Sequence, residues 1–297
     1  MILITGATGN IGKELVQDLQ SHGAEFQVMV RKEETRSLMA SRGIKAVLGD
    51  FHEPGTFANA LKGVRQVFLL TTPQPDIVKV EGAFLNEARK AGVQRVVRLS
   101  AVGANPWGSS PLARGHGQCE AQLEASGMAW TILRPTMFMQ NIAPMYGESV
   151  AKTSTLFAPA GEARIPWVDT RDVAALAGTV LIEAGHEGLV YDITGPELLT
   201  YEGVADLLSA QLGRTVKFVD VPDDAAYNSM TGMGMSGWFA HSIITLFHMF
   251  RANGSTALTL GTLARVTGRV PRTLDNYIKE NINVFQGTRA GAPVRSS

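Results

Sequence analysis

Short apolar runs alternate with helix-length segments through the first 135 residues of the chain. In the first of these segments Ile11, Leu15, Val16 and Leu19 recur on one helical face. The runs themselves are apolar at successive positions, as strands are when helices cover both faces of a parallel sheet. They lie at 2–5, 26–30, 44–48, 67–71, 95–100 and 130–134, and the helix-length segments span 11–22, 33–42, 54–63, 76–91 and 113–126.

This rhythm predicts repeated βαβ units with right-handed crossovers. We therefore expect an α/β fold, a doubly wound parallel sheet of the Rossmann type. Its strand order should be 3-2-1-4-5-6, with one further strand. Pro54 suits the first turn of its helix, because proline lacks only a donor that would be unpaired there.

The pattern loosens after Pro135, where several Pro and Gly residues leave only short apolar runs as far as 168. A helix is predicted from about 171, a strand over 189–195, and a helix capped by Thr200, then the strand "TVKFVDVP". From 223 onward the pattern is helical. We expect residues 1–135, with 169–194 returning to them, to form an NADP-binding domain. Residues 136–168 and 195–287 should form a smaller, mostly helical substrate-binding part, and 288–297 a loose tail.

Composition narrows the class of protein. Lys+Arg and Asp+Glu are both 27, so a nucleic-acid partner is not expected. The longest apolar stretch, 238–250, is too short to span a bilayer and carries two histidines, which predicts a buried or pocket-lining helix and no membrane association. Strand-like sequence from Ile2 leaves no room for a signal peptide, and Cys119 is the single cysteine, so we expect a cytoplasmic monomer or homodimer. The histidines show no metal-ligand spacing, and no metal is expected.

A glycine-rich turn, "ITGATGNIG", follows the first strand and opens the first helix. Such a turn brings backbone N–H groups and a helix amino end to one point, which suits a pyrophosphate. A side chain at Gly6 or Gly9 would hold phosphates away, and Gly12 lets helix and strand pack closely. The alternative is a glycine-rich turn without a ligand. The residues expected to contact the cofactor here are Gly6, Thr8, Gly9, Asn10, Ile11 and Gly12.

The end of the second strand indicates which dinucleotide binds. An NAD site usually has an acidic residue there, which binds the ribose hydroxyls. This chain has Arg31 and Lys32, and a guanidinium suits the 2′-phosphate of NADP(H). Glu33 and Glu34 follow at once, and the alternative is a solvated pair of cations on a loop. We predict NADP(H) as the cofactor.

Three stretches together resemble one family. "TGATGNIG", "VLGDF" (47–51) and "HGQCEAQLEASGMAWTILRP" (116–135) resemble the atypical short-chain dehydrogenase/reductases of the NmrA-like branch. That branch includes NAD(P)H:quinone oxidoreductases, azo- and triphenylmethane-dye reductases, and redox-sensing regulators. The closing "TGRVPRTLDNYIKENINVF" (267–285) is similar to the C-terminal helix of many bacterial members, so the resemblance covers nearly the whole chain.

The resemblance implies roles for residues at the carboxyl ends of strands. Asp50 and Phe51 match the pair that brackets the adenine, and Ser100 matches the family's active-site Ser/Thr. The segment "RPTMFMQN" (134–141) matches the one that passes over the nicotinamide. From it Pro135 and Met137 are expected cofactor contacts, and the stretch beside the nicotinamide ribose is Thr71, Thr72 and Pro73.

The family's Tyr-x-x-x-Lys pair is missing, and no Tyr occurs between residues 1 and 145. His116 and Glu120 stand in the corresponding helix as His-x-x-x-Glu, a pattern that looks like the quinone and dye reductases. An ordinary imidazole titrates near neutral pH and can donate a proton, and Glu120, one turn on, could orient it. The alternative is that His116 only binds the nicotinamide ribose or caps a polar pocket. We expect Ser100, His116 and Glu120 to be the catalytic residues.

The predicted function is NADPH-dependent hydride transfer to an apolar aromatic acceptor, a quinone or a polyaromatic, polyketide-like ketone. Quinones accept hydride readily and solvent can protonate the product, so they fit the absence of the Tyr. The alternative is a non-catalytic NADP(H)-binding redox sensor of the NmrA type. The residues expected to contact the substrate are Trp107, His116, Phe138, Asn141, Trp167 and Trp238.

Overall fold

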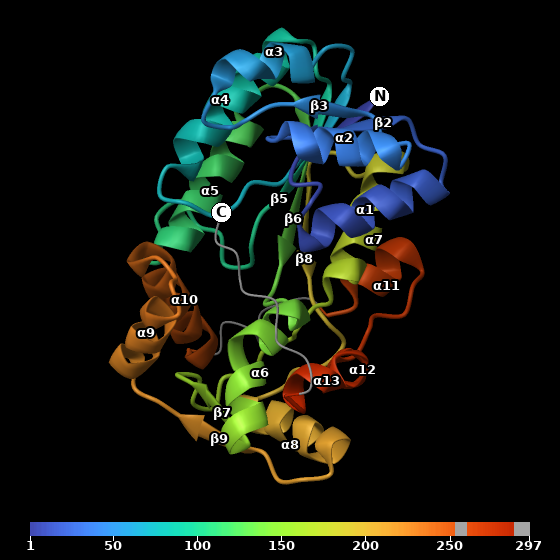
Figure 1. Ribbon diagram of the computed structural model, residues 1–297. Coiled ribbons are helices and arrows are strands. Elements are labelled where there is room, and N and C mark those ends of the chain that lie inside the picture. The colour runs from blue at the N-terminus through green and yellow to red at the C-terminus, as the bar shows by residue number, and fades with distance from the viewer. Residues whose placement is uncertain (253–259, 288–297) are drawn as a thin grey trace. The chain divides into compact units, whose positions relative to one another are not determined.

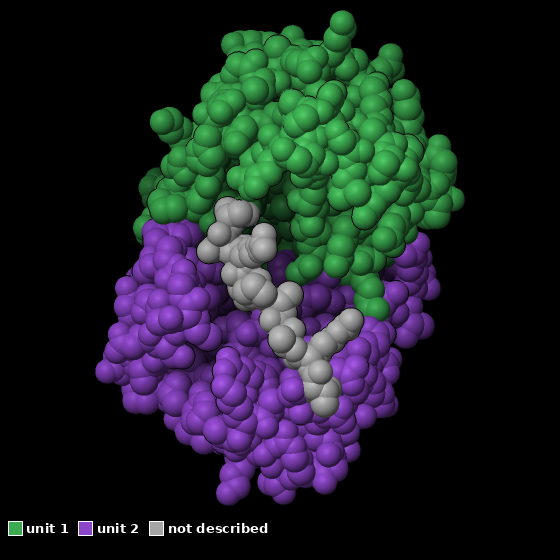
Figure 2. All heavy atoms as spheres, in the orientation of Figure 1, with its two compact units in different colours: residues 1–135, 171–192 green, residues 136–170, 193–297 purple. Residues whose placement is uncertain are grey.

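The computed structural model describes residues 1–252 and 260–287. The tail predicted to be loose, 288–297, lies outside the described residues. The chain forms two compact units, and Figure 2 gives each its own colour. Unit 1 comprises residues 1–135 and 171–192, and unit 2 comprises residues 136–170 and 193–297.

A seven-stranded sheet forms the centre of unit 1. The hydrogen-bonded pairs from β3 through β6 are parallel, and β8 is the further strand, beside β6. This confirms the predicted order. From one edge to the other the strands are β3 (Ala46–Leu48), β2 (Phe26–Val30), β1 (Ile2–Ile4), β4 (Gln66–Leu69), β5 (Arg95–Leu99), β6 (Ala129–Pro135) and β8 (Leu189–Ile193).

Helices cover both faces of this sheet, with α1 and α7 on one face and α4 and α5 on the other (Figure 1). The predicted apolar face of the first helix is confirmed, because Ile11, Leu15, Val16 and Leu19 are all buried. On the opposite face Phe57, Phe84 and Leu123 join Leu3 and Val96 in one core cluster. The helices of unit 1 are α1 (Asn10–Ser21), α2 (Glu33–Ser41), the 3-10 turn η1 (Pro54–Thr56), α3 (Phe57–Ala60), α4 (Ile77–Lys90), α5 (Pro111–Glu124) and α7 (Thr170–Ile182).

The strand register brings several chain segments together at the carboxyl edge of the sheet. Ile4 is paired with Phe68, and Leu99 with Leu133. Thr5 and Ser100 continue these strands, donating from their backbone N–H to the carbonyls of Phe68 and Leu133. The turn after β1 and the residues after β4, β5 and β6 therefore share one edge, which is where open α/β sheets bind ligands.

Unit 2 is mostly helical around a small parallel pair, β7 and β9. The predicted cap at Thr200 is confirmed: its side chain accepts from the Gly203 N–H at 3.1 Å. The elements of unit 2 are η2 (Met139–Asn141), α6 (Ile142–Thr153), β7 (Thr155–Ala158), α8 (Tyr201–Leu212), β9 (Lys217–Asp220), α9 (Asp223–Gly232), α10 (Gly237–Arg251), α11 (Thr262–Thr267), α12 (Leu274–Glu280) and α13 (Ile282–Phe285).

The stretch 136–168 is more regular than its sequence indicates, because it contains both α6 and β7. Pro144 and Gly147 lie inside α6 and mask its helical pattern. Gly147 is close to Val284 of α13, so close packing explains this glycine. β7 has only four residues, and it is a strand because β9 pairs with it from about sixty residues further along the chain.

Among residues 1–252 and 260–287, no helix has the length and apolar character to cross a membrane. In the same residues no three His, Cys, Asp or Glu side chains are grouped so that they could hold a metal ion.

Candidate functional site

The turn between β1 and α1 shows which of its glycines the fold itself requires. A Cβ on Gly12 would lie 2.1 Å from the Gly6 carbonyl oxygen, and one on Gly6, which has a φ of +66°, would lie 2.5 Å from Leu70 Cδ2. At Gly9 the nearest atom to an added Cβ is the Gly6 oxygen at 3.4 Å, an ordinary contact. Gly6 and Gly12 are thus needed by the turn, whereas Gly9 leaves space that a phosphate can enter.

Within residues 1–252 and 260–287, no side-chain cap hydrogen bond is formed at the amino end of α1. Gly9 is the N-cap, and the first turn holds no acidic residue. Thr8, Gly9 and Asn10 are exposed, while Ile11 and Gly12 are buried. The first N–H groups of a helix are unpaired and carry partial positive charge, so this end favours an anion. The residues present therefore fit the pyrophosphate of a dinucleotide.

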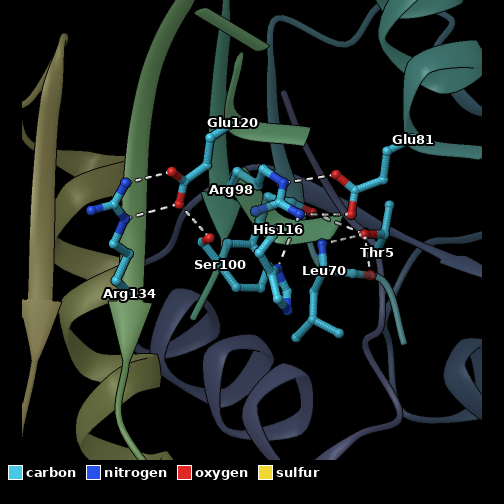
Figure 3. Close-up of polar contacts among 9 residues, drawn as sticks. Thr5, Leu70, Glu81, Arg98, Ser100, His116, Glu120 and Arg134 are labelled. Atoms are coloured by element: carbon cyan, nitrogen blue, oxygen red, sulfur yellow. Dashed lines mark hydrogen bonds and ion pairs between the residues drawn. The ribbon is translucent and has the colours of Figure 1, made fainter. Parts of the chain in front are cut away.

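Thr5 joins this turn to the end of β4. Its fully buried hydroxyl accepts from the Leu70 N–H at 2.8 Å and donates to the Leu70 carbonyl at 2.9 Å (Figure 3). Thr71 follows, and its buried Oγ1 has no hydrogen-bond partner among the described residues. An unpaired buried hydroxyl costs free energy, and a ligand hydroxyl or amide could satisfy it. Thr72 is exposed and Pro73 half-buried beside it.

The ends of β2 and β3 hold the residues expected around the adenosine. Arg31 and Lys32 are exposed directly after β2. Glu33, which could have opposed them, forms a two-pronged ion pair with Arg36 at 2.7 and 2.9 Å instead. After β3, Asp50 accepts the His52 N–H at 2.9 Å. The Phe51 ring packs on Phe57 and Phe84, with ring centroids 6.1 and 5.2 Å away.

A buried polar network lies near the carboxyl ends of β5 and β6 (Figure 3). Arg98 of β5 is fully buried and binds Glu81 of α4, with 2.7 Å between Arg98 Nε and Glu81 Oε2. Arg98 Nη2 also lies 3.2 Å from Nδ1 of His116, on α5. These three side chains come from three different elements and meet inside unit 1.

The electrostatics at His116 differ from the sequence-based expectation. Burial, and then the positive charge of Arg98, lower the pKa of His116 to about 3. Its imidazole is therefore neutral at physiological pH, and it does not titrate near neutrality as the reference value suggested. His116 is 5% exposed.

Glu120 has other partners than the one expected. Arg134 of β6 binds its carboxylate with two nitrogens, at 2.9 and 2.5 Å, and the Ser100 hydroxyl donates to the same carboxylate (Figure 3). His116 and Glu120 share the buried face of α5, but the guanidinium of Arg134 and the hydroxyl of Ser100 take up the carboxylate. The side chain that contacts His116 is Arg98, so the expectation that Glu120 orients His116 was wrong.

The remaining predicted site residues belong to other segments of the chain. Trp107 precedes α5 and is 89% exposed. Pro135 ends β6 in unit 1, whereas Met137, Phe138, Asn141, Trp167 and Trp238 belong to unit 2.

Trp167 lies in the core of unit 2, 1% exposed, with its ring centroid 5.6 Å from that of Tyr201. In this position it does not form the wall of an open pocket. Trp238 is half-buried in α10 and stacks on Phe239. Met137 is buried, Phe138 is half-buried and Asn141 is exposed at the end of η2.

Unit 2 has an apolar cavity of about 460 Å³. α6, β7, α9 and α10 line it, and the substrate residues predicted in unit 2, Phe138, Asn141, Trp167 and Trp238, do not contribute. Glu148 and Lys152, a charged pair among its described lining residues, are highly exposed. The larger apolar side chains in its wall are Met145, Phe157, Met230, Met233 and Phe247.

The sequence interpretation missed Arg98, Glu81 and Arg134. A signal for Arg98 was present, because an arginine inside the apolar run "RVVRLS" must be buried with a counter-charge. Glu81 likewise sits on the helix face that buries Ile77 and Phe84. Which acid meets which base depends on how α4 and α5 pack on the sheet.

Comparison with known proteins gives full-length matches. The sequence profile of the NmrA-like family matches residues 1–278. An NAD(P)H azoreductase of Xenophilus azovorans is 37% identical over 285 residues, covering 96% of this chain and 99% of that protein. A (4-alkanoyl-5-oxo-2,5-dihydrofuran-3-yl)methyl phosphate reductase of Streptomyces griseus is 31% identical over 288 residues, covering 96% and 99%. The crystal structure of an Escherichia coli NADPH-dependent quinone oxidoreductase with NADPH superimposes with a TM-score of 0.87 at 25% identity, covering 95% of this chain and all of that one.

Proposed function

The chain belongs to the NmrA-like family, and we propose that this NAD(P)H-dependent reductase passes hydride from NADPH to an apolar aromatic acceptor, a quinone or a polyaromatic ketone. The observation that carries the proposal is the bare amino end of α1. The geometry of the turn does not require a glycine at position 9. Gly9 is the N-cap of α1, where a bound phosphate would approach the backbone.

NADP(H) is the cofactor, and its binding can be assigned to groups of unit 1. The donors at the start of α1 would hold the pyrophosphate, and Arg31 and Lys32 would bind the 2′-phosphate. The pairing of Glu33 with Arg36 supports this, because it keeps that carboxylate on another cation. Asp50 and Phe51 would flank the adenine, and the Thr71 hydroxyl would reach the nicotinamide ribose.

When bound, NADPH supplies the hydride, and the protein supplies positioning and electrostatics. In the proposal Ser100 and His116 lie at the reacting end of the site. Glu120 accepts a hydrogen bond from the Ser100 hydroxyl, which fixes the orientation of that hydroxyl, and Arg134 holds Glu120. Since no Tyr lies between residues 1 and 145, an acceptor whose reduced form takes its proton from water fits best.

The acceptor class has support from unit 2. The cavity of about 460 Å³ has the size of a small-molecule site, and three methionines and two phenylalanines contribute to its wall. Methionine side chains adapt to flat ligands of different shape and make favourable contacts with aromatic rings. A neutral aromatic molecule suits such a wall better than a sugar or an acid.

The test follows the absorbance of NADPH in the presence of menadione, an azo dye or a polyaromatic ketone. We expect acceptor-dependent oxidation of NADPH with at least menadione, and much slower oxidation of NADH at equal concentration. Binding of NADPH without oxidation by any acceptor would contradict the reductase and favour the redox-sensor alternative. Equal rates with NADH would contradict the assignment of Arg31 and Lys32 to the 2′-phosphate.

A further inference from the structure

Arg98 is a full positive charge inside an apolar strand. Its side chain is 0% exposed, and that of its partner Glu81 is 1% exposed. Removing two charges from water costs about as much as their attraction returns, so a buried pair is weak evidence for stability. Two apolar side chains could fill the same space, so we expect the charged pair to have a role other than stabilising the fold.

The contact of Arg98 with His116 indicates this role. A guanidinium has only N–H donors, so the Nδ1 of His116 must be the acceptor of the Arg98 Nη2 proton. A neutral imidazole carries one proton, and that proton is then on Nε2. In Figure 3 the second ring nitrogen of His116 points away from Arg98. A second proton, on Nδ1, would face the guanidinium N–H directly.

We propose that Arg98, held in place by Glu81, is a positioning residue that keeps His116 neutral with its proton on Nε2, so that His116 offers the acceptor a hydrogen bond. The role toward the acceptor rests on the proposed function. A neutral imidazole does not give up its remaining proton near neutral pH. His116 therefore stabilises negative charge on the acceptor oxygen, and water protonates the product.

The other groups around the ring leave this assignment unchanged. Glu81 of α4 faces Arg98 and neutralises it, and Glu120, one turn along α5, is bound by Arg134 of β6. Cys119, also on α5, is buried, and burial raises the pKa of its thiol to about 12, so it stays uncharged. Arg98 is the one charged group in direct contact with the imidazole among the described residues.

The test is a heteronuclear NMR titration of the His116 ring nitrogens in the full chain without NADPH. Long-range couplings distinguish a proton on Nε2 from one on Nδ1. The test variant is Arg98→Met with Glu81→Met, which removes both charges and leaves none of them buried alone. Arg98→Lys is the conservative variant. The matched control is Arg95→Met with Glu187→Gln. It removes the ion pair between Arg95, which also lies on β5, and Glu187, with 3.4 Å between Arg95 Nη1 and Glu187 Oε1.

In the unmodified protein and the control we expect the Nε2–H form alone and no protonation above pH 5. In the double variant we expect both tautomers and a rise of the titration midpoint by about one unit or more. Arg98→Lys should retain the Nε2–H form. A proton on Nδ1, or a midpoint near 6.5 in the unmodified protein, overturns the proposal, and so does a double variant identical to it. If the double variant does not fold, the unmodified protein and Arg98→Lys decide.

This readout is independent of the reductase assay, because it needs neither cofactor nor acceptor. The expected spectra together with no NADPH oxidation would refute the proposed function and leave the positioning role intact. If both hold, the ketone reduction rate should be flat between pH 5.5 and 8 in the unmodified protein. In the double variant it should change with pH.

Discussion

The three glycines of the first turn illustrate how single residues divide between folding and binding. Gly12 lies against the Gly6 carbonyl and the Ala7 backbone, so the chain itself requires a hydrogen at that position. Gly9 has no comparable neighbour. Equal spacing in the sequence therefore conceals two different physical reasons for the same residue type.

Gly12→Ala should reduce the stability of the fold, whereas Gly9→Ala should reduce NADPH binding. Gly12→Ala should lower the free energy of unfolding by about 1–3 kcal/mol, because the new methyl group meets backbone that cannot move away. Gly9→Ala should leave the unfolding free energy within about 0.5 kcal/mol. It should weaken NADPH binding tenfold or more, because the methyl group occupies the phosphate's place.

Urea denaturation measures the first effect and calorimetric titration with NADPH the second. Gly232→Ala serves as the control, since nothing lies within 4 Å of its added carbon. Unchanged NADPH affinity in Gly9→Ala would mean that the pyrophosphate does not bind at this turn.

At the scale of the element, α5 carries candidate site residues and also packs against the loop that joins β5 to α5. Its buried face carries His116, Glu120 and Leu123. Gly117 lies on the same helix, where an added Cβ would be 2.3 Å from the Pro106 nitrogen and 2.4 Å from the Asn105 carbonyl carbon. The loop that joins β5 to α5 therefore passes directly over this helix, and a side chain at Gly117 would push it away.

Gly115 and Gly117 provide a matched pair of substitutions within α5. Alanine favours a helix interior over glycine by roughly 0.5–1 kcal/mol. At Gly115 the nearest atom is a side-chain methyl, Ile77 Cγ2 at 3.1 Å, so the change should be close to neutral. At Gly117 the clash with backbone should exceed that gain and lower the unfolding free energy by about 1–3 kcal/mol. Thermal and urea unfolding would show this, and equal stability of the two variants would contradict the close approach.

At the scale of the whole molecule, the buried ionisable groups of unit 1 make stability depend on pH. Glu81 and Glu120 each have an arginine, so their charges are compensated. His116 is different, because burial and Arg98 disfavour its charged form and lower its pKa to about 3. The unfolded chain can protonate this histidine near pH 6.5 and the folded chain cannot.

The folded-state pKa of His116 lies below the unfolded-state value, so its contribution to stability decreases as the pH falls. The stability that neutral His116 contributes is fully present above pH 6.5 and is lost as the pH falls from 6.5 toward 3. Its contribution to the slope is at most about 1.4 kcal/mol per pH unit. Urea titrations between pH 7 and 5 should show a steeper fall in the unfolding free energy for the unmodified protein than for His116→Phe. Equal slopes would mean that His116 titrates normally in the folded state.

Much of the fold could be predicted because its signals are local. The burial of Ile11 and Leu15, the cap at Thr200 and the helix beginning near Asp223 all follow from residues within one or two turns of each other. The order of the sheet followed from the alternation of strands and helices, since short crossovers of one hand leave few topologies. The pair β7 and β9 was not predictable in this way, because its partners are about sixty residues apart.

The sequence by itself determined that a bare helix end follows the first strand, and that cations follow the second. Both depend on residues a few positions apart, whose geometry the backbone fixes. Only the tertiary structure decided that Arg98 meets Glu81 and His116, and that Glu120 meets Ser100 and Arg134. Those groups come from separate strands and helices. Their partners, and through burial the pKa of His116, depend on how those elements pack around one core.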